Sequence, residues 1–283
     1  MKMTLDIRIA PNSGFCFGVR RAIEIAETTL RSGGRAYSLG PIIHNPQVIK
    51  RLRAEGLETI EEIGEVKDGK VIIRSHGVHP DAIEELEAKG VEIVDATCPL
   101  VKKAQKSARL LYEEGYAVII VGERNHPEVQ GLLGHAPGAV VVEAKDEIPK
   151  FKSHARLGIV AQTTQYPADF RRVIERVISC DFDELRVFNT ICNATVVRQE
   201  AAVELAGQVD IMFVLGGRNS ANTNRLAEIC RSTGVETRHI ESADELDESW
   251  LEGKRKVGVT AGASTPGWII EEFIARLEEI SKR

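Results

Sequence analysis

Three of the five cysteines in this 283-residue sequence stand at matching places in a repeated pattern. The pattern is Cys-x-x-Val-basic-basic-Ala, and two copies match it well: Cys16-Phe-Gly-Val19-Arg-Arg-Ala22 and Cys98-Pro-Leu-Val101-Lys-Lys-Ala104. Cys192-Asn-Ala-Thr-Val-Val197-Arg198 is a looser third copy. Each of these cysteines stands where a helix is expected to begin, and a helix amino terminus favours thiolate over thiol.

Three thiolates that meet at one point would form a metal site. Soft thiolates select zinc, copper(I) or iron–sulfur clusters, and three ligands leave one metal position open for a substrate. The alternative is that each cysteine is a small buried hydrophobic residue, which is our interpretation of Cys180 and Cys230 because neither lies at a repeat position. The basic pairs after Cys16 and Cys98 either offset a concentrated negative charge or form solvated surfaces.

Polar loops follow the cysteines at a constant spacing. His44, His126 and Ser220 each lie 28 residues after a repeat cysteine. A third loop follows in each copy, and these loops contain His76, Thr163 and Ser264. Coincidence among many similar loops is the alternative to a true repeat.

The loop residues are rich in hydrogen-bond donors and include groups that can be cationic. This composition suits a phosphate or a diphosphate, and Asn222 adds another donor beside Ser220. There is no Walker loop or Gly-x-Gly-x-x-Gly motif, so a nucleotide is not expected. A single histidine of this kind is more often an ordinary surface or core residue.

Glu128 lies two residues after His126. A carboxyl group in an enclosed pocket has a raised pKa and serves as a general acid. The alternative is a glutamate that favours the start of a helix through the helix dipole.

Short apolar runs alternate with amphipathic stretches along the chain, which predicts βα units and a mostly parallel sheet. The predicted strands are Leu5–Ile9, Val71–Ser75, Glu92–Asp95, Ala117–Val121, Val140–Val142, Gly158–Ala161, Leu185–Phe188, Ile211–Leu215 and Val257–Thr260. The predicted helices are Val19–Leu30, Asp81–Lys89, Pro99–Glu114, Ala168–Val177, Thr195–Ala206, Asn222–Ser232 and Gly267–Ile280.

The repeat divides the chain into three α/β lobes of about 90 residues each. We predict lobes over residues 14–97, 98–190 and 191–283, with the strand in 1–13 completing the third. Sites in parallel sheets form at the carboxyl ends of strands. The fold class is therefore α/β, with three pseudo-repeated lobes and mostly parallel sheets around a central cleft.

Composition excludes several other classes of protein. Hydrophobic residues make up 43% and charged residues 28% of the chain, as in globular proteins. A net charge of −5 argues against a nucleic-acid surface. The apolar runs are too short to span a membrane, and Met1–Gly14 has no secretion signal, so we expect a cytoplasmic protein. The odd cysteine count argues against a disulfide framework.

Taken together, these motifs closely resemble the 4-hydroxy-3-methylbut-2-enyl diphosphate reductase family, over about residues 8–275. The motifs that match are Gly14-Phe-Cys16-Phe-Gly-Val19, Arg74-Ser-His76-Gly77, Asp95-Ala-Thr-Cys98-Pro99, His126-Pro-Glu128, Gln162-Thr-Thr164, Thr190-Ile-Cys192, Asn219-Ser220-Ala-Asn222-Thr-Asn-Arg225-Leu226 and Thr260-Ala-Gly-Ala-Ser264. The resemblance implies an iron–sulfur oxidoreductase of the last step of non-mevalonate isoprenoid biosynthesis. Its substrate would be a small allylic diphosphate, (E)-4-hydroxy-3-methylbut-2-enyl diphosphate, and its products isopentenyl and dimethylallyl diphosphate.

The resemblance also assigns roles to individual residues. It implies one [4Fe–4S] cluster with Cys16, Cys98 and Cys192 as ligands and an open fourth iron. Glu128, with Thr163 and His126, would supply the proton. The diphosphate and its chain would be bound by His44, His76, His126, Thr163, Ser220, Asn222 and Ser264. The expected electron donor is a ferredoxin or a flavodoxin. Family members often have serine where Ala221 stands.

Two other functions are compatible with the same residues. One is a zinc hydrolase of a phosphorylated substrate, in which the three thiolates and a water molecule hold the metal. The other is a redox or metal sensor without catalytic activity. One zinc without acid-labile sulfide would favour the hydrolase over the reductase. A cluster spectrum that does not change when the substrate is added would favour the sensor.

Overall fold

The computed structural model describes residues 4–282, and within them the chain forms two compact units. Unit 1 comprises the described residues of Met1–Val19 and Asn193–Arg283 together with His44–Val48. Unit 2 comprises Arg20–Ile43 and Ile49–Cys192. Every strand pair in the three four-stranded sheets of the described residues is parallel, which confirms the predicted fold class.

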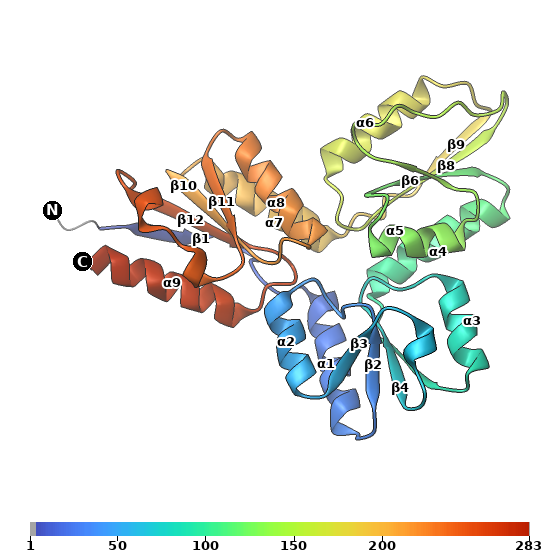
Figure 1. Cartoon of the computed structure of the whole chain (residues 1–283). Coiled ribbons are helices and arrows are strands. Elements are labelled where there is room, and N and C mark those ends of the chain that lie inside the picture. Colours follow the sequence, from blue (N-terminus) through green and yellow to red (C-terminus); the bar gives the residue numbers. More distant parts are fainter. Residues whose placement is uncertain (1–3, 283) are drawn as a thin grey trace. The chain divides into compact units, whose positions relative to one another are not determined.

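Unit 1 contains one sheet with the order β1-β12-β10-β11. Its strands are β1 (Asp6–Ile9), β10 (Ile211–Leu215), β11 (Glu236–Ile240) and β12 (Lys256–Ala261). Its helices are α7 (Asn193–Ala206), α8 (Ala221–Ser232) and α9 (Gly267–Lys282), with short 3₁₀ turns at Ala243–Glu245 and Glu248–Leu251. Figure 1 shows α9 running along this sheet.

The central strand β10 explains why unit 1 is a sheet covered on both faces. Side chains alternate between the faces of a strand, and a parallel sheet buries both. Ile211, Phe213 and Leu215 pack in one core cluster with Phe273 of α9. Met212 and Val214 pack in another, with residues of α7 and α8. The continuous apolar run of β10 is therefore buried on both faces of the sheet.

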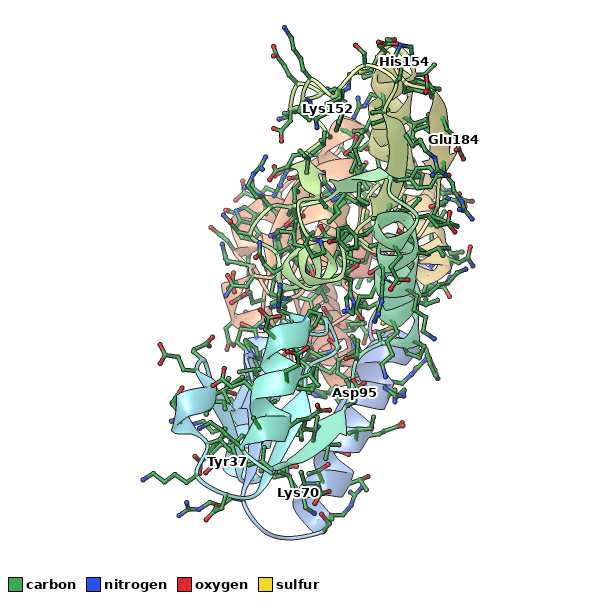
Figure 2. The ribbon with its side chains drawn as sticks, turned by 90° about the vertical axis from the view of Figure 1, so that its right-hand side faces the viewer. Tyr37, Lys70, Asp95, Lys152, His154 and Glu184 are labelled. Atoms are coloured by element: carbon green, nitrogen blue, oxygen red, sulfur yellow. The ribbon has the colours of Figure 1, made fainter. Side chains whose placement is uncertain are left out.

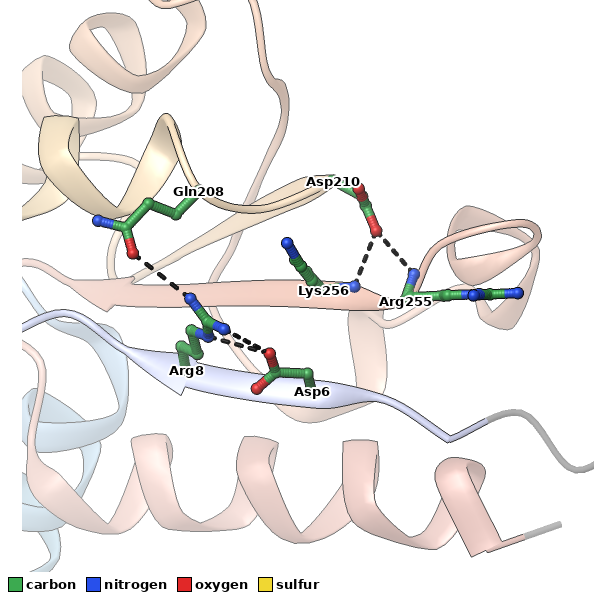
Figure 3. A network of polar contacts seen from close by, with 6 residues as sticks. All are labelled: Asp6, Arg8, Gln208, Asp210, Arg255 and Lys256. Atoms are coloured by element: carbon green, nitrogen blue, oxygen red, sulfur yellow. Dashed lines mark hydrogen bonds and ion pairs between the residues drawn. The ribbon is translucent and has the colours of Figure 1, made fainter.

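Polar contacts join the beginnings of the strands in unit 1 (Figure 3). The Asp210 carboxylate accepts hydrogen bonds from the backbone N–H groups of Arg255 and Lys256, both at 2.8 Å. Asp6 binds two nitrogens of the Arg8 guanidinium at 3.0 and 2.7 Å. These contacts fix the amino ends of the strands, away from the carboxyl ends where parallel sheets form their sites.

Unit 2 contains two sheets, with the orders β3-β2-β4-β5 and β7-β6-β8-β9. The first has β2 (Ala36–Leu39), β3 (Leu57–Ile60), β4 (Lys70–Ile73) and β5 (Glu92–Asp95). Its helices are α1 (Phe17–Arg31), α2 (Pro46–Ala54) and α3 (Pro80–Ala88), with a 3₁₀ turn at Ile63–Glu65. The boundary between the units falls within α1 and within α2, so each of these helices has residues in both units.

The second sheet of unit 2 has β6 (Ala117–Val121), β7 (Val140–Val142), β8 (Arg156–Ala161) and β9 (Glu184–Val187). Its helices are α4 (Pro99–Glu113), α5 (Pro127–His135) and α6 (Pro167–Ile178). At the amino ends of β8 and β9, Glu184 binds Tyr116 and pairs with Arg156, and the nearby His154 pairs with Asp183. Figure 2 shows Glu184 and His154 at this end of the sheet.

The internal repeat recurs in the backbone hydrogen bonds. In each sheet the glycine after one strand donates its N–H to the last residue of the neighbouring strand. The three bonds are Gly40 to Ile60 at 2.8 Å, Gly122 to Val142 at 3.2 Å and Gly216 to Ile240 at 3.0 Å. The same glycines begin the loops that the 28-residue spacing singled out.

Among the strands and α-helices of the described residues, five were not predicted from the sequence: β2, β3, β11, α2 and α5. The three strands are short or rich in polar residues, and the two helices begin at a proline. The predicted boundaries of three lobes stay a prediction. Within residues 4–282 no helix combines the length and the apolar character needed to cross a membrane.

Candidate active site

Each repeat cysteine lies directly before a helix, as predicted. Cys98 is the N-cap residue of α4, Cys16 precedes α1 and Cys192 precedes α7. The Sγ atom of Cys16 accepts the N–H of Val19 at 3.5 Å. All three cysteines are partly exposed, and no described cysteine forms a disulfide.

A hydrogen bond repeated three times fixes the backbone of these cysteines. Each donates its N–H to a carbonyl in the loop that follows a neighbouring strand. The pairs are Cys16 with Ala263 at 3.1 Å, Cys98 with Ser75 at 3.0 Å, and Cys192 with Thr163 at 2.9 Å. The first pair lies in unit 1 and the other two in unit 2. The cysteines and the third polar loops of the repeat are thus connected through the backbone.

The other two cysteines differ from this set. Cys230 is buried in the core cluster of α8, and burial raises the pKa of its thiol to about 12. A thiol of this kind is unreactive. Cys180 donates its S–H to the carbonyl of Arg176 at 3.6 Å, within one turn at the end of α6. Both environments fit the interpretation that these cysteines are structural.

Basic residues near the starts of the repeat helices hold the loops that carry cysteines. Arg21 donates to the carbonyl of Thr97 at 3.2 Å, directly before Cys98. Arg198 is 3% exposed and donates to the carbonyl of Gly14 at 2.8 Å. Lys102 forms an ion pair with Asp95. Arg198 is therefore no part of a solvated surface, and these contacts between loops could not be predicted from the spacing of the residues.

Glu128 of α5 and Thr163 after β8 form the centre of the site in unit 2. One carboxylate oxygen of Glu128 accepts the backbone N–H of Thr163 at 2.6 Å, and the other accepts its hydroxyl at 2.8 Å. The carbonyl of the same threonine accepts the N–H of Cys192. Thr163 therefore connects the candidate acid to a candidate metal ligand.

Burial raises the pKa of Glu128 to about 7, because the side chain is only 1% exposed. The two hydrogen bonds from Thr163 act against this shift, and the negative charge of Glu123 adds to it. A carboxyl with this pKa is protonated in part of the molecules at neutral pH, as general acid catalysis requires. The interpretation as a mere helix-start glutamate does not explain this burial.

His126 and His76 lie beside this pair. The Nδ1 atom of His126 accepts the N–H of Glu128 at 3.1 Å, so His126 is the N-cap residue of α5. Neutral His126 therefore has its proton on Nε2, where it can be donated. The rings of His76 and His126 meet edge to face, with centroids 5.4 Å apart. In unit 2 the structure thus brings together two of the histidines predicted from the sequence.

In unit 1 the predicted serines come together with the backbone of His44. The Ser264 hydroxyl donates to the carbonyl of His44 at 3.0 Å and lies 3.4 Å from the hydroxyl of Ser220. Asn222, the second residue of α8, is 6% exposed, and its Nδ2 has no hydrogen-bond partner among the described residues. A buried amide donor without a partner is costly, and a bound anion would satisfy it.

The predicted site residues therefore form one group in each unit. Unit 1 contains Cys16, His44, Ser220, Asn222 and Ser264, and unit 2 contains His76, Cys98, His126, Glu128, Thr163 and Cys192.

One detail of the repeat differs from the prediction. Ser220 and His126 are N-cap residues of their helices, but in the first copy Asn45 caps α2, so His44 lies one residue earlier. Ala221 is the first residue of α8 and is buried.

Two buried side chains that organise this region were missed in the sequence. Gln162 accepts the N–H of Glu123 at 2.9 Å and donates to Thr164 at 2.9 Å. The hydroxyl of Thr190 accepts the N–H of Ala161 at 2.8 Å. Both residues lie within motifs noted above, but only the structure shows which backbone and side-chain groups they bind.

Comparison with known proteins shows the family of this chain. The model of the family described as LytB protein matches residues 7–278. The chain belongs to the LytB protein family. The match covers nearly the whole chain, and so includes all the candidate residues of both units.

Curated relatives in the LytB family are similar over their whole length. A protein of Geotalea uraniireducens (strain Rf4) is 50% identical over 279 residues, which is 98% of this chain and 99% of that protein. One of Geobacter metallireducens is 49% identical over 277 residues, or 98% of each. Both are named 4-hydroxy-3-methylbut-2-enyl diphosphate reductase.

Two solved structures are also similar to the chain. One, named as (E)-4-hydroxy-3-methyl-but-2-enyl diphosphate reductase, the terminal enzyme of the non-mevalonate pathway, is 45% identical with a TM-score of 0.67. The match covers 98% of this chain and all of that one. The second, the E-1-hydroxy-2-methyl-but-2-enyl-4-diphosphate reductase of Plasmodium falciparum, is 28% identical with a TM-score of 0.89. That match covers 96% of this chain and 87% of the other.

Proposed function

We propose that this chain is a reductase that removes the hydroxyl group of (E)-4-hydroxy-3-methylbut-2-enyl diphosphate and yields isopentenyl and dimethylallyl diphosphate. The names of the LytB relatives support this activity. The observation that carries it is the buried Glu128, bound by the residue that also accepts the Cys192 N–H. A proton donor connected to a candidate metal ligand suits a reaction that needs both protons and electrons.

The donor set fits an iron–sulfur cluster. Cys16, Cys98 and Cys192 occupy equivalent helix starts, are partly exposed and form no disulfide among the described residues. Soft thiolates are the usual ligands of such clusters. When bound, a [4Fe–4S] cluster held by three cysteines supplies electrons and one iron with an open coordination position. The other two cysteines do not fit this role, because Cys230 is a buried thiol and Cys180 donates to a carbonyl in the last turn of the preceding helix.

The reaction consumes two electrons and two protons. The carbon–oxygen bond of the allylic alcohol breaks, the oxygen leaves as water, and a new carbon–hydrogen bond forms at one end of the allylic unit. The two products differ in which end receives the proton. Glu128 supplies a proton, and the Thr163 hydroxyl bonded to Oε2 lies on the path by which it passes to the substrate.

The diphosphate end is bound by hydrogen-bond donors from both groups of residues. Ser220, Asn222 and Ser264 supply two hydroxyls and the unpartnered amide of unit 1. His76 and His126 supply ring N–H groups in unit 2, and His44 acts with the serines. A diphosphate carries several negative charges, and hydrogen bonds to charged groups are stronger than neutral ones.

The electrons come from outside the chain, since an enzyme that consumes two electrons in each turnover must be reduced again. We propose a small redox protein of the ferredoxin or flavodoxin type as the donor. No nucleic acid or membrane takes part in the proposed reaction.

The test is turnover by anaerobically purified protein with a chemical reductant, followed by chromatography of the products. We expect isopentenyl and dimethylallyl diphosphate from the wild type. Glu128→Gln is expected to keep its iron and its affinity for inorganic pyrophosphate but to lose at least 99% of turnover, because general acid catalysis contributes about 100-fold or more. The exposed Glu147→Gln is the matched control and should behave as the wild type.

Three outcomes would contradict the proposal. Near-wild-type turnover in Glu128→Gln would reject the assignment of the acid. One zinc per chain without acid-labile sulfide, combined with release of phosphate, would favour the hydrolase instead. A cluster whose spectrum does not respond to the substrate, in protein without turnover, would favour the sensor.

A further inference from the structure

The side chain of Thr223, in the first turn of α8, is fully buried against two glycines that belong to the loops of Ser220 and Ser264. We infer that Thr223 is a positioning residue that sets the spacing of these two serines and thereby the affinity of the site for a diphosphate. The inference rests on the proposed function, since the serines are assigned to the diphosphate there. All residues concerned lie in unit 1.

The closest approach is to Gly262, in the loop after β12. A Cβ atom built on Gly262 would lie 2.0 Å from Oγ1 and 3.0 Å from Cβ of Thr223. No real Cβ atom is found so close to another heavy atom. The threonine hydroxyl therefore fills the space that any other residue at position 262 would need, and the loop is held directly against α8.

The second approach is to Gly216, in the loop after β10. A Cβ atom on Gly216 would lie 3.0 Å from Oγ1 and 3.2 Å from Cγ2 of Thr223, and 2.4 Å from Oγ1 of Thr265. Gly216 also has a φ of +138°, which favours glycine. Both branches of the threonine side chain therefore lie in the space that a Cβ atom on either glycine would need.

The two glycines connect directly to the serines. Ser220 lies four residues after Gly216, and its hydroxyl accepts the N–H of Thr223 at 3.3 Å. Gly262 lies two residues before Ser264, and its carbonyl accepts the N–H of Thr265 at 3.0 Å. A change in the distance between α8 and either loop would therefore change the separation of the two hydroxyls, now 3.4 Å.

The role of Thr223 is one of shape. Its Oγ1 has no hydrogen-bond partner among the described residues, so the hydroxyl contributes its volume and contributes no bond. Packed interiors respond to changes as small as one methyl group. The preceding residue, Asn222, carries the unpartnered amide, so a displaced α8 would move this donor together with Ser220.

The test uses Gly262→Ala in the anaerobic, cluster-loaded protein, with inorganic pyrophosphate as the probe in isothermal titration calorimetry. We expect the dissociation constant to rise at least tenfold and KM to rise with it, while iron content and kcat change less than threefold. Gly207→Ala is the matched control, because a Cβ atom there would meet nothing closer than 3.7 Å. It should leave the affinity unchanged.

Rescue separates positioning from general destabilisation. Thr223→Ala removes both Oγ1 and Cγ2, so in the double variant Gly262→Ala/Thr223→Ala the added methyl group meets only the Cβ of residue 223, at 3.0 Å, and a small shift relieves this contact. We expect it to regain most of the lost affinity. If Gly262→Ala does not yield folded protein, Thr223→Ala alone replaces it, with an expected rise of at least threefold in the dissociation constant.

Unchanged pyrophosphate affinity in the single variant, or a double variant no better than Gly262→Ala, would overturn the inference. Failure of this inference can be told apart from failure of the proposed function. Pyrophosphate binding can be measured whether or not the wild-type protein has reductase activity.

Discussion

The buried carboxyl of Glu128 makes the stability of the fold depend on pH in a way that one substitution removes. Its pKa in the folded protein is raised from 4.5 to about 7 by burial. Between these values the folded state binds a proton that the unfolded chain releases, so stability falls as pH rises through this range. Glu128→Gln cannot titrate and loses this dependence.

The magnitude follows from the two pKa values. The difference between the two pKa values lowers the stability of the folded state by about 1 kcal/mol at pH 5 and about 3 kcal/mol at pH 8. The free energy of unfolding of Glu128→Gln relative to the wild type should therefore increase by about 2 to 3 kcal/mol between these two pH values. Other titrating groups are common to both proteins and cancel in the difference.

The assay is urea unfolding followed by far-UV circular dichroism, on anaerobic protein of known iron content, at pH 5 and pH 8. Glu147→Gln is the control, and its difference from the wild type should be the same at both pH values because the side chain is exposed. A Glu128→Gln difference that stays constant within about 0.5 kcal/mol would refute the raised pKa and with it the assignment of the acid.

Three further predictions concern the metal ligands, the acid and the anion site. Cys98→Ser should lose most of the iron, whereas Cys180→Ser and Cys230→Ser should keep it; loss of iron from either of the latter would overturn the choice of ligands. The rate of turnover at low substrate concentration should fall as pH rises through about 7, because the protonated form of Glu128 is required. A rate that increases over this pH range would contradict the assignment of Glu128 as the acid. Asn222→Ala should weaken pyrophosphate binding about tenfold or more, since a hydrogen bond to a charged group contributes about 1.5–3 kcal/mol, and unchanged affinity in calorimetry would remove Asn222 from the site.

The parallel α/β fold could be predicted because its central strands are continuous apolar runs. Ile211–Leu215 and Ala117–Val121 were predicted with the bounds that the structure has. The strands that were missed have no such signal: β11 is Glu-Thr-Arg-His-Ile, and β3 is Leu-Glu-Thr-Ile. These strands form because their backbones make hydrogen bonds with a neighbouring parallel strand. The residues of the strand alone do not indicate that such a neighbour is present.

The helices α2 and α5 were missed for a different reason. Each begins with a proline, and α5 contains Gly131 and Gly134, which weaken any helical pattern. In the structure the prolines stand at the first helical position, where a missing N–H has no cost. The 28-residue spacing nevertheless found the loops before both helices, since these loops are positioned by the strands.

Much of the site could be predicted from spacing, but its contacts could not. The repeat identified Cys16, Cys98 and Cys192, and the structure adds the backbone bond that each makes. Spacing left Glu128 open between an acid and a helix-start residue, and only its burial with Thr163 favours the first. Contacts between loops distant in sequence, such as Thr223 with Gly262, have no signal in a single sequence.

The central proposal is that Cys16, Cys98 and Cys192 hold one iron–sulfur cluster whose remaining iron binds the substrate. Mössbauer spectroscopy of anaerobic protein enriched in ⁵⁷Fe, with and without the allylic diphosphate, tests this most directly. We expect a minor signal, about a quarter of the iron in a four-iron cluster, that differs from the rest and shifts when the substrate is added. A spectrum in which all the iron is equivalent and unchanged by the substrate would contradict the claim.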